Sequence, residues 1–103
     1  MAAELVWLEE AESDLQSIFD YISADNIRAA EAYTGSIVEA CDRLRGFPLS
    51  GRAFDKHYRI LVVRNHLVLY RHDQQNAEVV IAAIIDGRRD LAVLLRGLSE
   101  PET

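Results

Sequence analysis

The sequence predicts an α+β fold, and three observations support this class. Two amphipathic helical patterns stand first in the chain, separated by only a few residues. Three strand-like segments follow them, with short turns between the segments. Helices grouped in one half and strands grouped in the other, without alternation, are typical of α+β domains. With 103 residues, the chain can bury one core, so we expect a single domain over residues 1–103.

The helical half follows a short strand candidate at residues 4–8. Its first pattern predicts a helix over about residues 9–23, because apolar residues recur at steps of three and four. The second pattern begins after Asp25 and Asn26, either of which suits an N-cap, and ends at Gly46 with Pro48 just beyond. So short a break predicts an antiparallel helical hairpin. The two apolar faces consist of Leu8, Ala11, Leu15, Ile18, Phe19 and Ile22, and of Ile27, Ala30, Tyr33, Ile37, Cys41 and Leu44.

The second half contains a predicted loop and three predicted strands. Pro48 and Gly51 indicate a loop over residues 47–57, and the strand candidates are residues 58–64, 67–72 and 78–85. Asn65 and His66 form a predicted two-residue turn between the first two strands. That turn places Arg59 opposite His72, and Leu61 opposite Tyr70.

Both faces of this predicted sheet are partly apolar, whereas one helical hairpin covers only one face. The second face carries Tyr58, Ile60, Val62, Leu67 and Leu69. A short amphipathic C-terminal helix is expected to cover part of it, with Leu91, Leu94, Leu95 and Leu98 on its apolar side. We expect the remainder to be an exposed apolar patch, which usually marks a site for a protein partner. The alternative is a sheet curled enough for the last helix to complete the cover.

Charge is divided unevenly along the chain. The net charge is −6, yet residues 1–42 hold ten acidic residues and one basic residue, and residues 43–103 hold ten basic and seven acidic residues. The acidic balance argues against a general nucleic-acid coat, which needs a continuous basic face. A local arginine site for an acidic partner remains possible.

Several function classes are not supported by any motif. The three histidines lack the close spacing of a zinc site, and no Gly-rich phosphate loop is present, so we expect neither a metal nor an organic cofactor. The longest apolar run is far shorter than the ~18 residues of a membrane span. The N-terminus does not resemble a secretory signal, and the lone Cys41 cannot form an internal disulfide, so a cytoplasmic location is expected.

The candidate functional residues follow the most apolar strand of the chain. Residues 79–85 are all uncharged and run directly into Asp86, Gly87, Arg88, Arg89 and Asp90. A guanidinium offers a planar fork of donors, so two adjacent arginines suit phosphate or carboxylate groups. The alternative is that they pair with the flanking aspartates and hold the strand end.

At this point the chain resembles ParE-type toxins of the RelE/ParE superfamily, which belong to type II toxin–antitoxin systems. The resemblance spans about residues 5–92 and depends on the order and spacing of short motifs rather than on any single one. These motifs are Trp7, Ala11, Asp14-Leu15, Ile18, Asp20-Tyr21-Ile22, Asp25-Asn26, Ala29-Ala30, Pro48, Gly51-Arg52, Tyr58 to Val62, Tyr70-Arg71 and Asp86 to Asp90.

The resemblance implies a helical hairpin packed on a small, mostly antiparallel sheet. It also implies a toxin that a cognate antitoxin neutralises in a hetero-oligomer, and that inhibits DNA gyrase by binding, without direct specific binding to nucleic acid. Arg59, Arg88, Arg89 and Asp90 are the expected target-binding residues, since the arginines stand at strand ends, away from the acidic helices. Asp90 has an alternative role as a structural partner or helix cap. Asp86 stands where many relatives of this family have a histidine before the Gly-Arg-Arg-Asp motif.

Two other functions compete with this interpretation. A RelE-like, ribosome-dependent mRNA endonuclease needs cations for the phosphorane charge and groups that move protons. Arg59 and Arg89 are the available cations, His72 opposite Arg59 is the candidate proton carrier, and no tyrosine or histidine follows Arg89. The other alternative is a degenerate, non-toxic interaction module that keeps only the fold and its partner.

Overall fold

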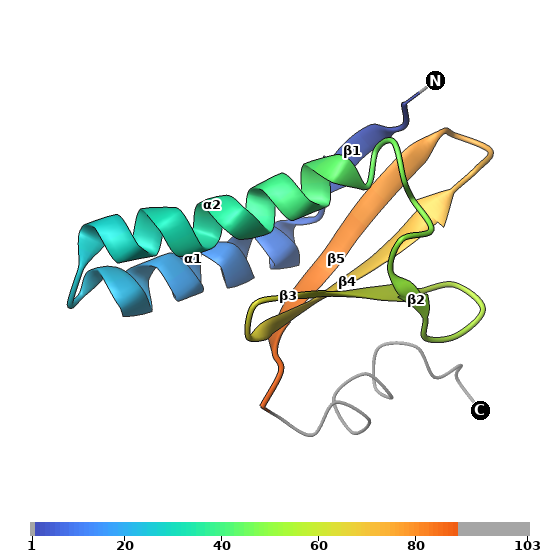
Figure 1. The fold of residues 1–103 in the computed structure, drawn as a ribbon. Coiled ribbons are helices and arrows are strands. Elements are labelled where there is room, and N and C mark those ends of the chain that lie inside the picture. The colour runs from blue at the N-terminus through green and yellow to red at the C-terminus, as the bar shows by residue number, and fades with distance from the viewer. Residues whose placement is uncertain (1, 89–103) are drawn as a thin grey trace.

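The computed structural model describes residues 2–88, and it has the predicted α+β architecture. Two antiparallel helices, α1 (Glu9–Ser23) and α2 (Ile27–Arg43), lie against one face of a five-stranded sheet (Figure 1). The strands are β1 (Glu4–Trp7), β2 (Arg52–Ala53), β3 (Arg59–Val63), β4 (His66–Asp73) and β5 (Glu78–Asp86). The predicted C-terminal helix, Arg89 and Asp90 lie outside the described residues.

The two helices begin and end almost where their sequence patterns predict. Three glutamates stand in the first turn of α1, where the helix dipole favours negative charge. At the start of α2, the side chain of Asn26 accepts a hydrogen bond of 3.0 Å from Ala29 N–H. Of the two N-cap candidates in the sequence, Asp25 and Asn26, the N-cap is therefore Asn26.

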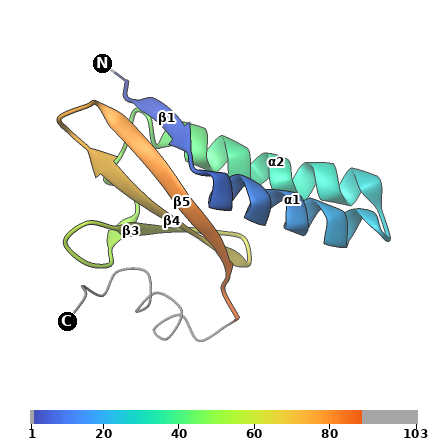
Figure 2. The ribbon, with the colours of Figure 1, turned by 180° about the vertical axis from the view of Figure 1, so that it is seen from behind.

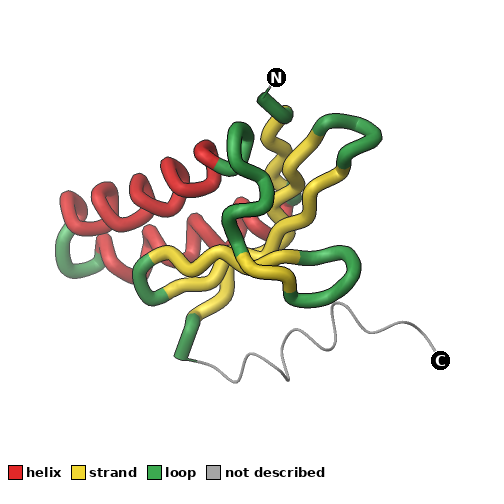
Figure 3. The backbone as a smooth tube through the Cα atoms, turned by 45° about the vertical axis from the view of Figure 1, so that its right-hand side comes forward, coloured by secondary structure: helices red, strands yellow, loops and turns green. Residues whose placement is uncertain are grey.

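The sheet is mostly antiparallel, with the strand order β1-β5-β4-β3-β2. Only β1 runs parallel to its neighbour, β5, and Figure 2 shows the two strands side by side. Strand β2 was not expected, because it lies within the predicted loop. It pairs Arg52 with Ile60 and Ala53 with Arg59. Figure 3 shows the chain between α2 and β2 as a long loop.

The predicted register of the β3–β4 hairpin is wrong. Arg59 lies opposite Tyr70 instead of His72, and the turn consists of Arg64 and Asn65. Contacts outside the hairpin hold this turn: Asn65 N–H donates to the Tyr33 hydroxyl, and Asn65 O accepts from Gly87 N–H at 2.9 Å. The residue opposite each position of β3 thus differs by two positions from the predicted one. A shift of two positions leaves every side chain on its predicted face of the sheet.

The helix-facing core is continuous across both layers. Ile37 and Cys41 of α2 pack with Val68, Tyr70 and Ile81 of the sheet. Burial raises the pKa of the Cys41 thiol to about 12, so this cysteine behaves as a core residue. In β5, Ala82 is an extra residue between the partners of Leu69 and Tyr70, and this bulge lets both Ile81 and Ile84 face the helices.

The other face of the sheet carries a second buried cluster. Ile60, Leu67, Leu69 and Ala83 are all buried there. Ile60, Leu67 and Leu69 of the predicted second face are thus covered, whereas Val62 of the same face is 62% exposed. The large apolar side chains with the greatest exposure on the non-helical part of the chain are Phe47, Leu49 and Val62. Within residues 2–88, no helix is both long and apolar enough to cross a membrane.

Asp14 of α1 ties the helical layer to β5. Strand β1 ends opposite Ile81, and farther along β5 the Ile84 N–H donates to Asp14 Oδ2 at 2.9 Å. Asp14→Ala leaves that donor unpaired and is expected to lower the free energy of unfolding by about 1–3 kcal/mol. Asp14→Asn keeps an acceptor oxygen and should lose less. Urea denaturation of both variants tests this, and equal losses would contradict the role of the hydrogen bond.

Candidate functional site

Arg88 lies just beyond the end of β5 and binds the carboxylate of Asp86 through hydrogen bonds. Its Nε and Nη2 atoms donate to the two oxygens at 3.2 and 2.9 Å, and its backbone N–H donates to Oδ1 at 2.9 Å. These bonds hold the pKa of Asp86 well below its usual range. The Arg88 side chain is nevertheless 85% exposed. Within residues 2–88, no hydrogen bond from its Nη1 atom is present.

Arg88 and Asp86 form one wall of a pocket of about 550 Å³, which we call the end pocket. The opposite wall comes from the helices, where Tyr21 of α1 is 84% exposed and Tyr33 of α2 lies deeper. The remaining lining residues are Ser17, Ile18, Ile22, Asn65 and His66. The end pocket thus combines aromatic and apolar walls with one cation and one carboxylate.

His66 belongs to a small hydrogen-bonded network in the end pocket, in which the Tyr33 hydroxyl contacts both His66 and Asn65. Its Nδ1 atom is 2.6 Å from the hydroxyl of Tyr33. That hydroxyl accepts a hydrogen bond from Asn65 N–H, which leaves its own proton to donate to Nδ1 of neutral His66. Asp86 lies directly opposite His66 on β5. Burial lowers the pKa of His66, although the Asp86 charge acts in the other direction.

We expect the stability of the protein to depend on the protonation of His66. Its folded-state pKa lies below the ordinary 6.5, so the unfolded chain takes up protons first as the pH falls. The free energy of unfolding should therefore be constant above about pH 6.5 and decline as the pH drops below it. His66→Gln should remove this decline, whereas Asp86 and Asp73, with lowered pKa values, act only in the more acidic range. Urea denaturation across the pH range would contradict the assignment if both proteins gave the same slope.

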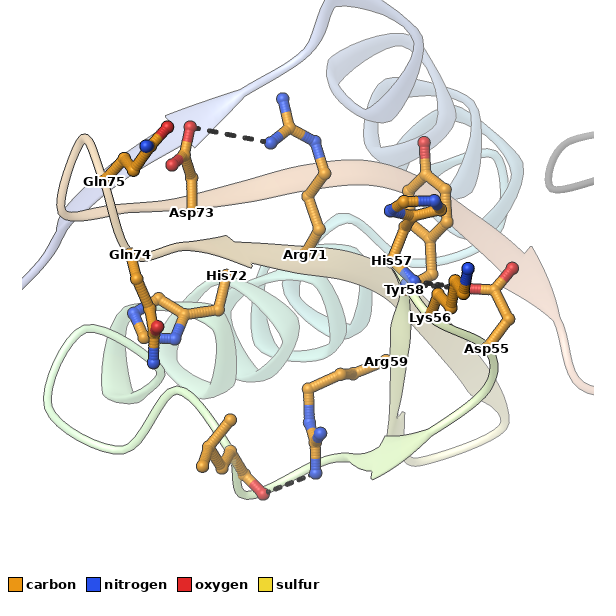
Figure 4. A pocket seen from close by; sticks show the side chains of 11 residues that line it. Asp55, Lys56, His57, Tyr58, Arg59, Arg71, His72, Asp73, Gln74 and Gln75 are labelled. Atoms are coloured by element: carbon orange, nitrogen blue, oxygen red, sulfur yellow. Dashed lines mark hydrogen bonds and ion pairs between the residues drawn. The ribbon is translucent and has the colours of Figure 1, made fainter.

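Arg59 lies at the other end of β3 and serves a different purpose. Its Nε and Nη2 atoms donate to the carbonyl of Gly51 at 3.0 and 2.7 Å, and Nη2 also donates to the carbonyl of Leu49 at 3.1 Å. Figure 4 shows the guanidinium extending to this loop. Arg59 is thus a clamp between the sheet and the loop that precedes β2.

A second pocket, of about 470 Å³, lies beside this clamp, and we call it the loop pocket. Its basic side chains are those of Lys56, His57, Arg59, Arg71 and His72 (Figure 4). Arg71 also forms a long ion pair of 3.8 Å with Asp73. Arg59 and His72 share this pocket although they are not opposite each other, since His72 lies opposite Val79 on β5.

Of the predicted site residues, the structure describes Arg59 and Arg88, and these two line different pockets. Arg59 lines the loop pocket and Arg88 lines the end pocket, and the strand β3 separates them. Arg89 and Asp90 follow Arg88 in the chain and lie outside the described residues. Among the described residues, no group of three or more His, Cys, Asp and Glu side chains is arranged to hold a metal ion.

Sequence reasoning did not single out Tyr33 and His66 as partners. Tyr33 belongs to the apolar face of a predicted helix, and His66 was expected to be a turn residue. The one available signal was weak: a buried tyrosine needs a partner for its hydroxyl. That partner is 33 residues away in the chain.

The family model of the ParE toxin of type II toxin–antitoxin systems (parDE) matches residues 5–91. This chain belongs to the ParE toxin family. No curated protein matches it in sequence.

Solved structures of the RelE/ParE superfamily share the fold of this ParE-family toxin. The chromosomal ParDE system from P. aeruginosa matches with a TM-score of 0.71 and 23% identity, covering 82% of this chain and 96% of that one. The RelBE2 toxin–antitoxin complex from Mycobacterium tuberculosis gives 0.65 and 19%, covering 84% and 99%. A double arginine mutant of E. coli toxin RelE in the free state gives 0.68 and 9%, covering 91% and 93%.

Proposed function

We propose that this ParE-family toxin is silenced by a cognate antitoxin and inhibits DNA gyrase by binding, without catalysing a reaction. The family match over residues 5–91 is the observation that carries the proposal. Two of the similar structures are a ParDE system and a RelBE2 toxin–antitoxin complex, which supports an antitoxin partner for this chain as well.

The end pocket supports Arg88 as a target contact. Its guanidinium is oriented by Asp86 through two hydrogen bonds, yet it stays exposed on its outer edge. A guanidinium held in this way loses little conformational entropy when a carboxylate or phosphate binds. Arg89 and Asp90 are the next residues in the chain, and we propose that Arg89 acts with Arg88 on an acidic surface of the target.

The contacts of Arg59 support binding over RNA cleavage. A nuclease would need this cation for the charge of the phosphorane, but its Nε and Nη2 donors are bonded to the carbonyls of Leu49 and Gly51. We therefore assign Arg59 a structural role in place of the target contact expected from its sequence position. RelE-like cleavage remains the second candidate, favoured by the cluster of nitrogen-bearing side chains in the loop pocket.

The deciding experiment is induced expression in a bacterial host that lacks the antitoxin. Growth arrest with gyrase-linked DNA breaks and intact mRNA is the expected result. Arrest with mRNA cleaved at ribosomes would contradict the proposal and favour the nuclease. Soluble protein that causes no arrest would favour the non-toxic interaction module instead.

Replacing Arg88 and Arg89 together with alanine is expected to abolish most of the toxicity. Loss of one well-placed interface arginine costs about 2 kcal/mol, or about 30-fold in affinity, so the double variant should bind gyrase weakly. Arg28→Ala, on the exposed start of α2, is the matched control and should leave arrest unchanged. Antitoxin binding shows that each variant is folded. A folded double variant that still arrests growth would show that these arginines do not contact the target.

A further inference from the structure

The loop between α2 and β2 presents two large apolar side chains to solvent. Phe47 is 71% exposed and Leu49 is 61% exposed, although the core of the sheet lies close by. We refer to residues 47–52, which include the first residue of β2, as the 47–52 loop. Single exposed apolar residues are common on protein surfaces, so the pair acquires meaning only from the way in which it is held.

The 47–52 loop is held rigidly by hydrogen bonds to the sheet. The buried hydroxyl of Tyr70 accepts from Gly51 N–H at 2.9 Å and donates to the carbonyl of Pro48 at 2.8 Å. Arg59 binds the carbonyls of Leu49 and Gly51, and Ser50 Oγ donates to the carbonyl of Phe47 at 2.7 Å. These bonds order the backbone on both sides of the two apolar side chains before any partner binds.

The surroundings of the 47–52 loop carry positive charge. Residues 43–59 contain five cationic side chains and a single carboxylate, that of Asp55. Leu49 itself lines the loop pocket. Figure 4 labels three cationic side chains of this pocket, Lys56, Arg59 and Arg71, and two carboxylates, Asp55 and Asp73. The contrast with residues 1–42, which hold ten acidic residues and one basic residue, is strong. Two exposed apolar side chains in a segment with an excess of positive charge fit a partner that offers both apolar groups and carboxylates.

We propose that the 47–52 loop is a docking surface for an acidic segment of a partner protein, with Phe47 and Leu49 as its apolar anchors. A few anchor side chains usually supply most of the affinity of an interface. When the backbone that carries them is already ordered, less conformational entropy is lost on binding. Arg52 and Lys56 select carboxylates around these anchors. The surface lies apart from the end pocket, so this contact is additional to the target contact of Arg88.

Selection from a library of short random peptides on the immobilised full-length protein tests this inference. Peptides that combine carboxylates with large apolar side chains should be enriched. One enriched peptide is then synthesised and its affinity is measured. Phe47→Ser with Leu49→Ser, and separately Arg52→Glu with Lys56→Glu, should each weaken it by about tenfold or more.

Ile27→Ser is the matched control, since Ile27 is 59% exposed and is the first residue of α2. Figure 1 shows that α2 begins at the helical hairpin turn, at the opposite end of the helix from the loop. It should leave the affinity unchanged, and thermal unfolding shows that every variant is folded. The proposal is overturned if no such peptides are enriched, or if the Phe47 and Leu49 variant binds them normally. It is also overturned if single-stranded RNA binds in their place and depends only on Arg52 and Lys56. None of these results bears on Arg88, whose role is tested by growth arrest.

Discussion

Gly51→Ala is expected to lower the free energy of unfolding by about 2–3 kcal/mol. A Cβ atom at this position would stand 2.6 Å from the carbonyl oxygen of Ile60 and 2.8 Å from the hydroxyl of Tyr70. The carbonyl belongs to the backbone of β3, which cannot move without disturbing its pairing with β4. The added methyl group therefore displaces the loop and breaks the hydrogen bond between Gly51 N–H and Tyr70.

Gly46→Ala provides the control for this prediction. A Cβ atom at Gly46 meets no other atom within 4 Å, so this change should alter stability by no more than about 0.5 kcal/mol. Urea denaturation of the two variants, with the slope m checked against the parent protein, measures the difference. Equal stability of the two variants would show that the loop shifts freely at Gly51. The rigidity on which the docking surface depends would then be lost as well.

The sequence predicted the helices more accurately than the sheet, and the reason is physical. Helix α1 obeys a local period of 3.6 residues, so its apolar face could be recognised without knowledge of its partners. The turn between β3 and β4 depends instead on Tyr33, a helical residue 32 positions from Asn65. No local pattern carries that information, and the predicted turn was consequently displaced by one residue.

The same distinction explains which site residues could be predicted. Arg88 follows an apolar strand directly, and a charged motif at a strand end is visible in the sequence. The partners of Arg59 are backbone carbonyls eight and ten residues away. Every residue has a backbone carbonyl, so the residue types in a sequence do not reveal such a partner. The sequence alone therefore does not distinguish an arginine that holds a loop from an arginine that is available to bind a ligand.

Tyr70→Phe should lower the free energy of unfolding by about 2–3 kcal/mol although it removes only one oxygen atom. The side chain is fully buried, and its hydroxyl pairs with both Gly51 N–H and the carbonyl of Pro48. Phenylalanine fills the same space, so no cavity forms and the loss measures two unpaired backbone groups. Tyr21→Phe removes an exposed hydroxyl and should be nearly neutral, which makes it the control.

A double-mutant cycle between Tyr70→Phe and Arg59→Ala would separate loop clamping from a general loss of packing. Both side chains hold the same six-residue loop, from opposite sides of Gly51. When either side chain is removed, the loop detaches and the remaining side chain stabilises it less. The summed losses in free energy of unfolding of the two single variants should therefore exceed the loss in the double variant. Strictly additive losses would mean that each contact acts alone. The 47–52 loop would then open in parts, and Phe47 and Leu49 would not be presented as one rigid pair.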